Sequence, residues 1–332
     1  MLEHGGALRA AAIRYRIPLG DWLDLSTGIH PQGWPVPPVP ATAWQRLPER
    51  EDGLEAVAAA YYGTRHLLPV AGSQAAIQAL PLLREPGRTG VLHPSYAEHA
   101  YAWQRAGHAI ATLTVAELDT AVDRLDVLVV VNPNNPTGLR FAPETLLRWR
   151  ERLARRDGWL VIDEAFMDAT PNDSLTGRAG AAGLIILRSL GKFFGLAGAR
   201  VGFVLAEPAV RERLQNALGP WTISGPARWV ATQALKDRRW QAEMRNCAPA
   251  WGERLAELLK RQRLPVAGGA ALFQWVPLPE AEFWQDALAR RGILVRRFTD
   301  PPGLRFGLPG DEPAWRRLEW ALTGIRAERL TH

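Results

Sequence analysis

The chain is predicted to be an α/β protein, with a mostly parallel seven-stranded sheet in a large domain and a smaller α+β domain at its C-terminus. Between about residues 46 and 206, short Val/Ile/Leu runs alternate with helical patterns, which is typical of parallel strands covered by helices on both faces. After about residue 207 this alternation stops, and helices precede a mixture of strands and helices. This change indicates a second, smaller unit.

The elements expected in the large domain follow from these runs. The expected strands are continuous apolar stretches at residues 90–93, 127–131, 160–163, 184–188 and 202–205, with a possible short strand at 67–71. The expected helices carry amphipathic patterns at residues 74–83, 97–106 and 143–156. Pro81 is expected to bend the first helix, since proline removes a helical hydrogen bond.

The two ends of the chain differ from this pattern. Residues 1–45 are proline-rich and are predicted to form an irregular arm that packs over another part of the molecule. Residues 46–206 would form the large cofactor-binding domain, and residues 207–332 the linking helices and the small domain. The elements expected in this last part are helices at 208–218, 226–236, 239–261, 280–291 and 312–325, and strands at 269–276, 293–297 and 304–308.

The composition is that of a globular protein: 332 residues, of which 47% are hydrophobic and 22% charged. A single cysteine, Cys247, excludes an intramolecular disulfide and fits a reducing compartment. The first residues lack the long apolar core of a secretion signal, and the longest apolar run, residues 125–131, is too short to span a bilayer. We therefore expect a soluble, cytoplasmic protein without a membrane partner.

The chain is basic, with 40 Lys and Arg against 34 Asp and Glu, a net charge of 40 − 34 = +6. A basic balance fits either a nucleic-acid partner or an anionic small molecule. No arginine–aromatic stripe, zinc-ligand spacing or helix-turn-helix pattern is present. We therefore expect a small-molecule substrate, with no nucleic-acid partner and no bound metal.

The segment SLGKFFGLAGAR at residues 189–200 gives the strongest functional signal. Lys192 stands among small and apolar residues, where a lysine amine can form a Schiff base with an aldehyde cofactor. Ser189 and Arg200 flank it and can hold a phosphate group. Together these residues indicate pyridoxal 5′-phosphate (PLP), and therefore amino-acid chemistry.

Asp163 is the candidate partner of the PLP ring nitrogen, because a carboxylate there keeps the ring protonated. It ends an apolar strand, and ligands of open α/β sheets bind at the carboxyl ends of strands. An aspartate that caps a turn is the alternative for such a position. Its spacing of 29 residues from Lys192 favours the cofactor role.

Four further positions could complete the cofactor site. Asn135, in the turn NPNNPTG at 132–138, could reach the ring 3′-oxygen, and Tyr96 could stack on the ring. Residues Gly72, Ser73 and Gln74 precede an expected helix and could bind phosphate through main-chain N–H groups. Each of these motifs alone is also compatible with an ordinary turn, helix cap or half-buried tyrosine.

For the substrate, Arg305 is the candidate carboxylate ligand, because arginine pairs with carboxylates through two hydrogen bonds. It lies within an apolar strand pattern, where a charged side chain is unusual unless it binds a partner. A strand arginine that faces solvent is the alternative.

In their order along the chain, these motifs resemble the fold-type I PLP enzymes of the aspartate aminotransferase superfamily. The resemblance covers nearly the whole chain and implies that Lys192 carries the cofactor, Asp163 pairs with its ring nitrogen and Asn135 contacts the 3′-oxygen. It further implies a homodimer. The remaining implied roles are phosphate binding by Ser73, Ser189 and Arg200, and binding of the substrate α-carboxylate by Arg305.

Within that superfamily, the chain most resembles the L-threonine-O-3-phosphate decarboxylase family of cobalamin biosynthesis. The similar segments are HGG at 4–6, LDLSTGIHP at 23–31 and GILVR at 292–296, and Phe166 stands where aminotransferases usually carry tyrosine. The resemblance implies decarboxylation of a phosphorylated amino acid. It also implies that His4, Gly5, Gly6 and Arg296 bind the substrate phosphate.

The sequence departs from the pattern of its relatives at His30 and Leu47, and from that of the aminotransferases at Phe166. His30 stands where asparagine is more usual, and Leu47 replaces a tyrosine that in relatives reaches the cofactor phosphate of the partner subunit. Phe166 cannot donate a hydrogen bond to the 3′-oxygen, which leaves that contact to Asn135.

Two other functions stay open at this point. A histidinol-phosphate or related phospho-amino-acid aminotransferase would share the same cofactor site, and Phe166 and the HGG segment favour the decarboxylase over it. A PLP-binding module without catalysis, acting through partners or nucleic acid, is disfavoured because every catalytic position is filled.

Overall fold

The fold comes from a computed structural model that describes residues 4–330. The chain divides into two compact units. The central unit holds residues 33–135 and 140–245, and the terminal unit holds the described residues of 1–32, 136–139 and 246–332. The expected domain boundaries near 45 and 206 stay a prediction beside this division. Each unit is described by itself.

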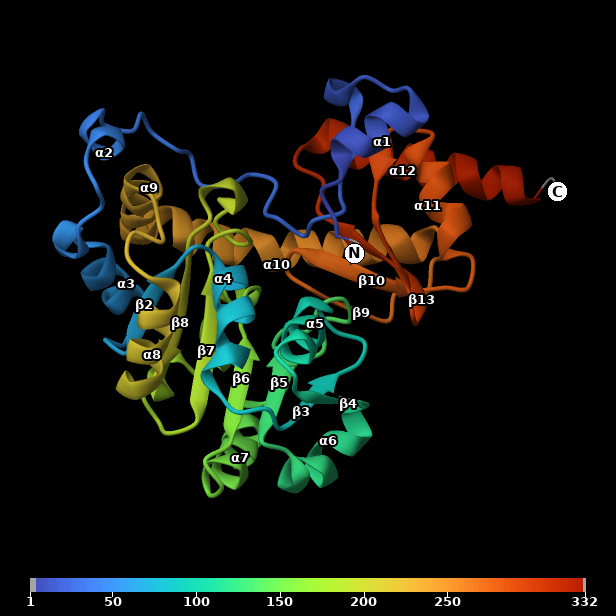
Figure 1. Cartoon of the computed structure of the whole chain (residues 1–332). Helices are drawn as coiled ribbons and strands as arrows, with labels where there is room; N and C mark the ends of the chain where they lie inside the picture. Colours follow the sequence, from blue (N-terminus) through green and yellow to red (C-terminus); the bar gives the residue numbers. More distant parts are fainter. Residues whose placement is uncertain (1–3, 331–332) are drawn as a thin grey trace. The chain divides into compact units, whose positions relative to one another are not determined.

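The central unit is built on a seven-stranded sheet with the order β2–β8–β7–β6–β5–β3–β4 (Figure 1). Strand β8 runs antiparallel to both of its neighbours, and the other strand pairs are parallel. This confirms the expected fold class. The strands are β2 (Leu67–Val70), β3 (Arg88–Leu92), β4 (Ala109–Leu113), β5 (Val127–Val131), β6 (Trp159–Asp163), β7 (Leu184–Ser189) and β8 (Gly202–Ala206).

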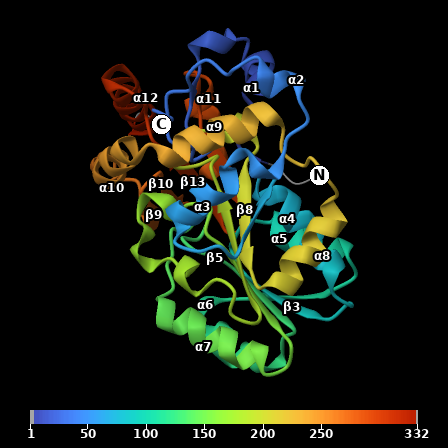
Figure 2. The same ribbon diagram turned by 90° about the vertical axis from the view of Figure 1, so that its left-hand side faces the viewer.

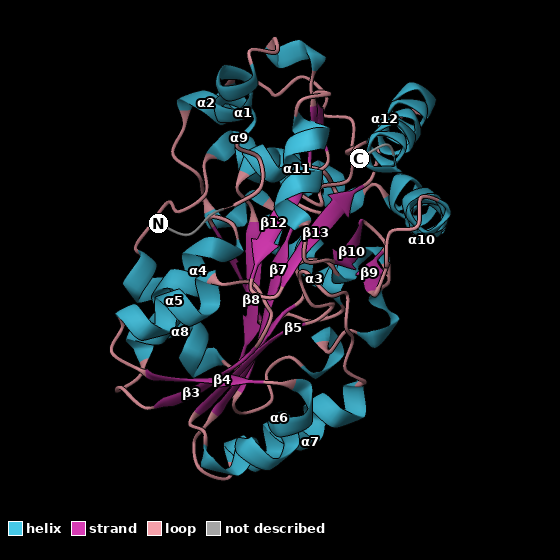
Figure 3. Ribbon diagram, turned by 90° about the vertical axis from the view of Figure 1, so that its right-hand side faces the viewer, coloured by secondary structure: helices cyan, strands magenta, loops and turns pink. Residues whose placement is uncertain are grey.

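Helices cover both faces of this sheet, as its continuous apolar strands require. Helices α4, α5 and α8 lie on one side, and α6 and α7 lie on the other (Figures 2 and 3). The helices of the central unit are α2 (Thr42–Gln45), α3 (Leu54–Tyr62), α4 (Ser73–Ala79), α5 (Glu98–Arg105), α6 (Val115–Ala121), α7 (Pro143–Ala154), α8 (Pro208–Leu218) and α9 (Gly225–Lys236).

Local sequence explains where several of these elements begin and end. Helix α4 stops at Ala79 and continues as a 3₁₀ turn over Leu80–Leu83, since Pro81 cannot supply the helical N–H. Strands β5, β6 and β7 are buried throughout, because both faces of the sheet are covered. Strand β4 and helices α3 and α6 were not expected, as their apolar patterns are short and interrupted.

The carboxyl ends of β5, β6 and β7 meet at one edge of the sheet. Asn132 follows β5, Asp163 ends β6, and Ser189 ends β7. The register pairs Val131 with Asp163, and Asp163 with Leu187. Parallel strands therefore gather polar side chains from distant parts of the sequence at a single edge.

The terminal unit contains an antiparallel sheet with the order β12–β13–β10–β9, and a short parallel pair of β1 with β11. The strands are β1 (Leu23–Asp24), β9 (Gly268–Ala270), β10 (Phe273–Pro277), β11 (Ile293–Leu294), β12 (Arg296–Thr299) and β13 (Pro302–Gly307). The helices are α1 (Leu8–Tyr15), α11 (Ala281–Ala289) and α12 (Glu312–Leu330). Helix α10 (Arg238–Arg261) begins in the central unit and ends in the terminal unit.

Three expectations for the terminal unit need correction. The strand expected at 293–297 is two strands in different sheets, because β11 pairs with β1 and β12 pairs with β13. The arm is not irregular throughout, because Leu8–Tyr15 forms helix α1, an alanine-rich stretch that precedes every proline of the chain. The single strand expected at 269–276 is two antiparallel strands, β9 and β10, joined by a short turn. Apolar composition alone does not reveal such a turn.

Within residues 4–330, no helix combines the length and the apolar character needed to cross a membrane.

His30 of the terminal unit is 2% exposed, and its ring centroid lies 5.6 Å from that of Trp251. Its Nδ1 accepts a hydrogen bond from the main-chain N–H of Gln32 at 3.2 Å. Burial lowers the pKa of His30 to about 4, against a weaker opposing contribution of the Gln32 contact. The fold therefore holds this histidine neutral.

We predict that this histidine makes the protein sensitive to acid. Between about pH 6.5 and pH 4, His30 is protonated in the unfolded chain but neutral in the folded chain. The free energy of unfolding therefore falls as the pH falls through this range. The full loss is about 3 kcal/mol. Denaturant titrations at several pH values across this range should show that His30→Asn loses less unfolding free energy on acidification than the unchanged protein does. The control variant, His66→Gln, changes an exposed histidine and should keep the native dependence of unfolding free energy on pH. If His30→Asn kept that same dependence, the prediction would be contradicted.

Candidate active site

Asp163 is held in a defined orientation at the end of β6. It is 3% exposed, and its Oδ1 accepts the main-chain N–H of Ala165 at 3.0 Å. Its Oδ2 lies 3.0 Å from Nε2 of His99. A buried carboxylate needs such partners, and these contacts fix the direction in which the carboxylate faces a ligand.

His99, on α5, was not identified from the sequence. It is 1% exposed, and its ring meets that of Tyr96 edge to face at a centroid distance of 6.0 Å. It therefore joins Asp163 to the expected stacking residue. The available signal was the spacing of three residues, since a helix that begins after Tyr96 brings His99 back to the same side.

The expected phosphate ligands come together where α4 and β8 begin. Gly72 has a φ of 72°, and a Cβ placed on it would lie 2.6 Å from Nη2 of Arg200. A Cβ on Gly202 would lie 2.6 Å from the main-chain nitrogen of Ser73. The first-turn N–H groups of α4, at Ser73 and Gln74, have no acceptor within the helix. Beside a guanidinium, such donors suit a phosphate group.

Arg200 itself has a φ of 55°, which is uncommon for a residue other than glycine. Such a conformation persists only where the surroundings impose it, and it occurs often at ligand sites. The Nη1 of Arg200 also donates to the main-chain oxygen of Ala197 at 3.1 Å. The turn 197–200 therefore aims this guanidinium at Gly72.

Ser189 and Lys192 lie in the turn that follows β7. The Oγ of Ser189 accepts the main-chain N–H of Gly191 at 3.2 Å. The Nζ of Lys192 lies 5.3 Å from the ring centroid of Phe166, which is 4% exposed. The lysine amine is therefore next to an aromatic face, an environment that favours a cation–π contact.

The side chains of Tyr96 and Gln74 form a hydrogen bond with each other. The Tyr96 hydroxyl donates to Oε1 of Gln74 at 3.3 Å, and Nε2 of Gln74 donates to Oε2 of Glu98 at 2.7 Å. Because both ends of the Gln74 amide have protein partners, its main-chain N–H is the group that would face a phosphate. Asn135 is half-buried in the turn after β5, as expected for a residue that meets a ligand.

A buried ionic cluster lies beside this site. Arg188, 1% exposed, donates through Nη1 to Oε2 of Glu164 at 2.6 Å and through Nη2 to Oδ1 of Asp168. Tyr61 donates to the same Asp168 oxygen at 2.9 Å and accepts from Nη2 of Arg245 at 2.8 Å. Two guanidinium groups thus balance two carboxylates.

Burial and charge act in opposite directions in this cluster. Burial lowers the pKa of the Arg188 guanidinium, but Asp168 and then Glu164 raise it by more, so the net pKa is well above its ordinary value. Burial, and then the charge of Asp168, raise the pKa of Tyr61 well above its usual value. Tyr61 therefore stays protonated and can donate to Asp168.

In the terminal unit, Ser26 gathers three of the expected substrate residues. Its Oγ accepts the main-chain N–H of Gly6 at 2.8 Å, and its carbonyl oxygen accepts Nη2 of Arg305 at 2.6 Å. A Cβ on Gly5 would lie 2.3 Å from that carbonyl oxygen, which leaves room only for glycine. Ser26 lies in the LDLSTGIHP segment at 23–31, and no local pattern there predicts this role.

Arg296 and Arg305 are direct cross-strand partners in the pair of β12 with β13. Opposed residues of antiparallel strands point to the same face, where two like charges repel each other. Arg296 is half-buried, and Arg305 is 4% exposed. An anionic ligand on this face could accept hydrogen bonds from both guanidinium groups. The side chain of His4 is exposed, in the same unit.

The residues of the central unit fit PLP. Cationic and N–H donors converge where a Cβ at Gly72 would collide with Arg200, and this suits the cofactor phosphate. Asp163, held by His99 and Ala165, is an acceptor suited to a protonated ring nitrogen. Lys192 supplies the amine in the same unit.

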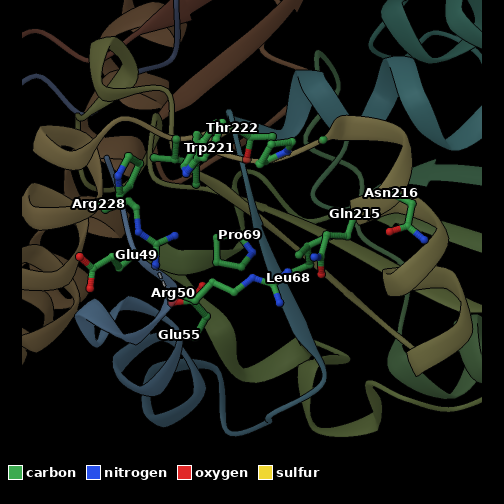
Figure 4. A pocket seen from close by; sticks show the side chains of 14 residues that line it. Glu49, Arg50, Glu55, Leu68, Pro69, Gln215, Asn216, Trp221, Thr222 and Arg228 are labelled. Carbon is green, nitrogen blue, oxygen red and sulfur yellow. Dashed lines mark hydrogen bonds and ion pairs between the residues drawn. The ribbon is translucent and has the colours of Figure 1, made fainter. Parts of the chain in front are cut away.

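A cavity of about 550 Å³ lies elsewhere in the central unit (Figure 4). Pro48, Arg50, Pro69 and Trp221 are among its lining residues, and none of the expected cofactor ligands lines it. Trp221 is 60% exposed. This cavity is therefore separate from the chemistry described above.

Comparison with known proteins gives a consistent result. Residues 48–323 match the model of the family described as aminotransferase class I and II. The chain is 58% identical over 326 residues to threonine-phosphate decarboxylase of Pseudomonas aeruginosa, covering 98% of each chain. It is 33% identical over 285 residues to histidinol-phosphate aminotransferase of Shewanella amazonensis, covering 77% of this chain and 76% of that one.

Among solved structures, histidinol-phosphate aminotransferase from Sinorhizobium meliloti in complex with pyridoxal-5′-phosphate has a TM-score of 0.82 and 20% identity. The match covers 99% of this chain and 96% of the other. At this identity the likeness shows the fold alone.

We predict that the ionic cluster is essential for stability. Arg188→Met leaves the buried carboxylates of Glu164 and Asp168 without the guanidinium that donates directly to both, which should cost about 3–5 kcal/mol of unfolding free energy. Arg261→Met removes an exposed pair with Glu319 and should cost less than about 1 kcal/mol. Chemical denaturation monitored by tryptophan fluorescence would measure the unfolding free energy of both variants. Equal losses of unfolding free energy would refute the prediction that the ionic cluster is essential for stability.

Proposed function

The chain belongs to the aminotransferase class I and II family, and within it we propose that it decarboxylates L-threonine O-3-phosphate. The products would be (R)-1-amino-2-propanol O-2-phosphate and carbon dioxide. The near full-length relative at 58% identity supports this assignment. The resemblance noted in the sequence places the reaction in cobalamin biosynthesis.

The geometric observation that carries the proposal is the opposed pair of Arg296 and Arg305. Threonine phosphate has two anionic groups, a carboxylate and a phosphate. Two arginines on one face of the small sheet can each bind one of them through paired hydrogen bonds. Arg305 is assigned to the α-carboxylate and Arg296 to the phosphate, with His4 and the main chain of Gly5 and Gly6 beside it.

Enzymes of this family use PLP, and the central unit would hold it. Arg200, Ser189, Ser73 and the main chain at Gly72 and Gln74 would bind its phosphate. When bound, PLP accepts the electron pair left behind as carbon dioxide departs. Tyr96 would cover the ring, and Asn135 would donate a hydrogen bond to its 3′-oxygen.

Two residues of this chain would act on protons during the reaction. Asp163, fixed by His99, would keep a proton on the ring nitrogen. Lys192, or a water, would return a proton to the carbon that loses carbon dioxide. The face of Phe166 beside the Lys192 amine carries no hydroxyl, so this side chain provides no competing donor.

The substrate phosphate would supply binding energy remote from the reacting carbon. Which bond of the substrate breaks depends on how the substrate is oriented, and that orientation requires at least two anchored groups. Arg296 and Arg305 would provide these anchors. Their spacing across two paired strands is fixed by the main-chain hydrogen bonds of the sheet.

We further propose a homodimer and a cytoplasmic location. Trp44, Leu47 and Trp221 of the central unit are 69%, 66% and 60% exposed, and such apolar surface is typical of a protein interface. Leu47 occupies the position from which relatives reach their partner's cofactor. The single cysteine supports a reducing compartment.

A histidinol-phosphate aminotransferase is the second candidate, because such an enzyme is 33% identical over most of the chain. It would share the residues that hold PLP. Histidinol phosphate carries a phosphate but no carboxylate, so in that enzyme Arg305 would bind the carboxylate of the amino acceptor, 2-oxoglutarate, and not a group of the phosphorylated substrate.

The deciding experiment measures carbon dioxide release from L-threonine O-3-phosphate by PLP-loaded protein without any keto acid. We expect release that yields aminopropanol phosphate and falls at least about 100-fold in Lys192→Ala. Amino transfer from histidinol phosphate to 2-oxoglutarate, with no carbon dioxide released, would instead establish the aminotransferase.

Arg296→Gln should raise KM for threonine phosphate about 10- to 100-fold, because a charge-assisted hydrogen bond contributes about 1.5–3 kcal/mol. The matched control is Arg297→Gln, whose arginine pairs with Glu282 at 3.1 Å. Steady-state kinetics on both variants would test this assignment. An equal rise in KM in the two variants would remove Arg296 from the substrate site.

A further inference from the structure

We propose that Asn134 is a positioning residue that locks the Tyr96 loop to the Asn135 turn and so fixes the cofactor ring between them. This inference deepens the proposed function and rests on its PLP site. Asn134 lies directly before Asn135, in the turn that follows β5. It is 0% exposed and was not singled out by the sequence.

The side chain of Asn134 spans two loops. Its Oδ1 accepts the hydroxyl of Ser95 at 2.8 Å, and its Nδ2 donates to the main-chain oxygen of Pro94 at 2.9 Å. Both partners immediately precede Tyr96, in the loop after β3. Strands β3 and β5 are hydrogen-bonded neighbours, so the two loops leave the same edge of the sheet.

The other end of Tyr96 is also held. Its hydroxyl donates to Oε1 of Gln74, and the opposite end of that amide donates to Oε2 of Glu98. The nitrogen of the Gln78 amide also donates to Glu98, at 3.1 Å. With the hydroxyl fixed by Gln74 and the loop fixed by Asn134, the plane of the ring is determined from both sides.

Asn134 therefore affects two residues that would contact the cofactor. Tyr96 would cover the ring face, and Asn135 would contact the 3′-oxygen at the ring edge. A ligand held by two loops binds tightly only when their spacing is set before it arrives, because ordering them on binding costs free energy. Asn134, itself fully buried, sets this spacing with two partly buried hydrogen bonds.

The same turn supplies a matched control. Asn132 is also 0% exposed, and its amide also makes two hydrogen bonds, both of them to main-chain atoms. Its Oδ1 accepts the N–H of Phe141 at 2.9 Å, and its Nδ2 donates to the Phe141 oxygen at 3.4 Å. Its side-chain hydrogen bonds therefore tie the turn to the segment before α7 and not to the Tyr96 loop.

The test compares Asn134→Ala with Asn132→Ala in full-length apoprotein. Both should lower the midpoint of denaturation, because each removes a buried amide. Only Asn134→Ala should raise the dissociation constant of PLP, by about tenfold, equivalent to about 1.4 kcal/mol. It should also weaken the visible circular dichroism of the bound cofactor, which reports a fixed ring orientation.

Ser95→Ala removes one of the two hydrogen bonds of Asn134 and leaves the buried Asn134 side chain in place. It therefore tests the inference even if Asn134→Ala does not fold. It should raise the dissociation constant by a smaller factor, and Ser95→Thr, which keeps the hydroxyl, should restore it. Native PLP binding and dichroism in Ser95→Ala, or equal losses in the two asparagine variants, would overturn this inference alone. A native apoprotein that binds no PLP would overturn the proposed function as well.

Discussion

The arrangement of the central unit depends on the buried cation of Arg188. Two carboxylates converge on it, one from the residue after Asp163 and one from the 3₁₀ turn Met167–Ala169. A charge this deep is tolerated only when its partners are fixed, so the cluster constrains the chain on both sides of β6 and β7. The residues that would touch PLP, Asp163 and Ser189, are the direct neighbours of that cluster.

A second constraint is the division of chemical roles between the two units. The central unit holds the amine, the carboxylate and the phosphate donors expected for PLP. The terminal unit holds the opposed pair of Arg296 and Arg305, and Ser26, which orders Gly5 and Gly6. In the proposed function, the residues that would bind the cofactor and those that would bind the substrate therefore lie in different compact units. Substitutions in one unit can therefore alter substrate choice while the cofactor ligands stay intact.

The departures from the family pattern also have a physical interpretation. His30 is buried and held neutral, so its imidazole can serve as a hydrogen-bond acceptor where relatives use an amide. Leu47 is exposed and apolar, so it could contribute surface but no hydrogen bond to a phosphate. Phe166 provides an aromatic face beside the Lys192 amine in place of a hydroxyl. Each change exchanges a polar contact for packing or for a different acceptor.

The sequence by itself determined the fold class and most of the candidate cofactor residues, because both are written in local patterns. Buried parallel strands are continuous apolar runs, and the polar residues at their carboxyl ends stand out against them, as Asp163 and Lys192 do. The sequence failed at helix α1 and at the division of β9 from β10, where the patterns are short. Only the tertiary structure decided the partners of these residues. Glu164 and Asp168 meet Arg188, Asn134 meets Ser95, and Arg296 faces Arg305 across two strands. Such contacts join segments that are distant along the chain, and their pairing follows from strand order and register, which no local pattern encodes.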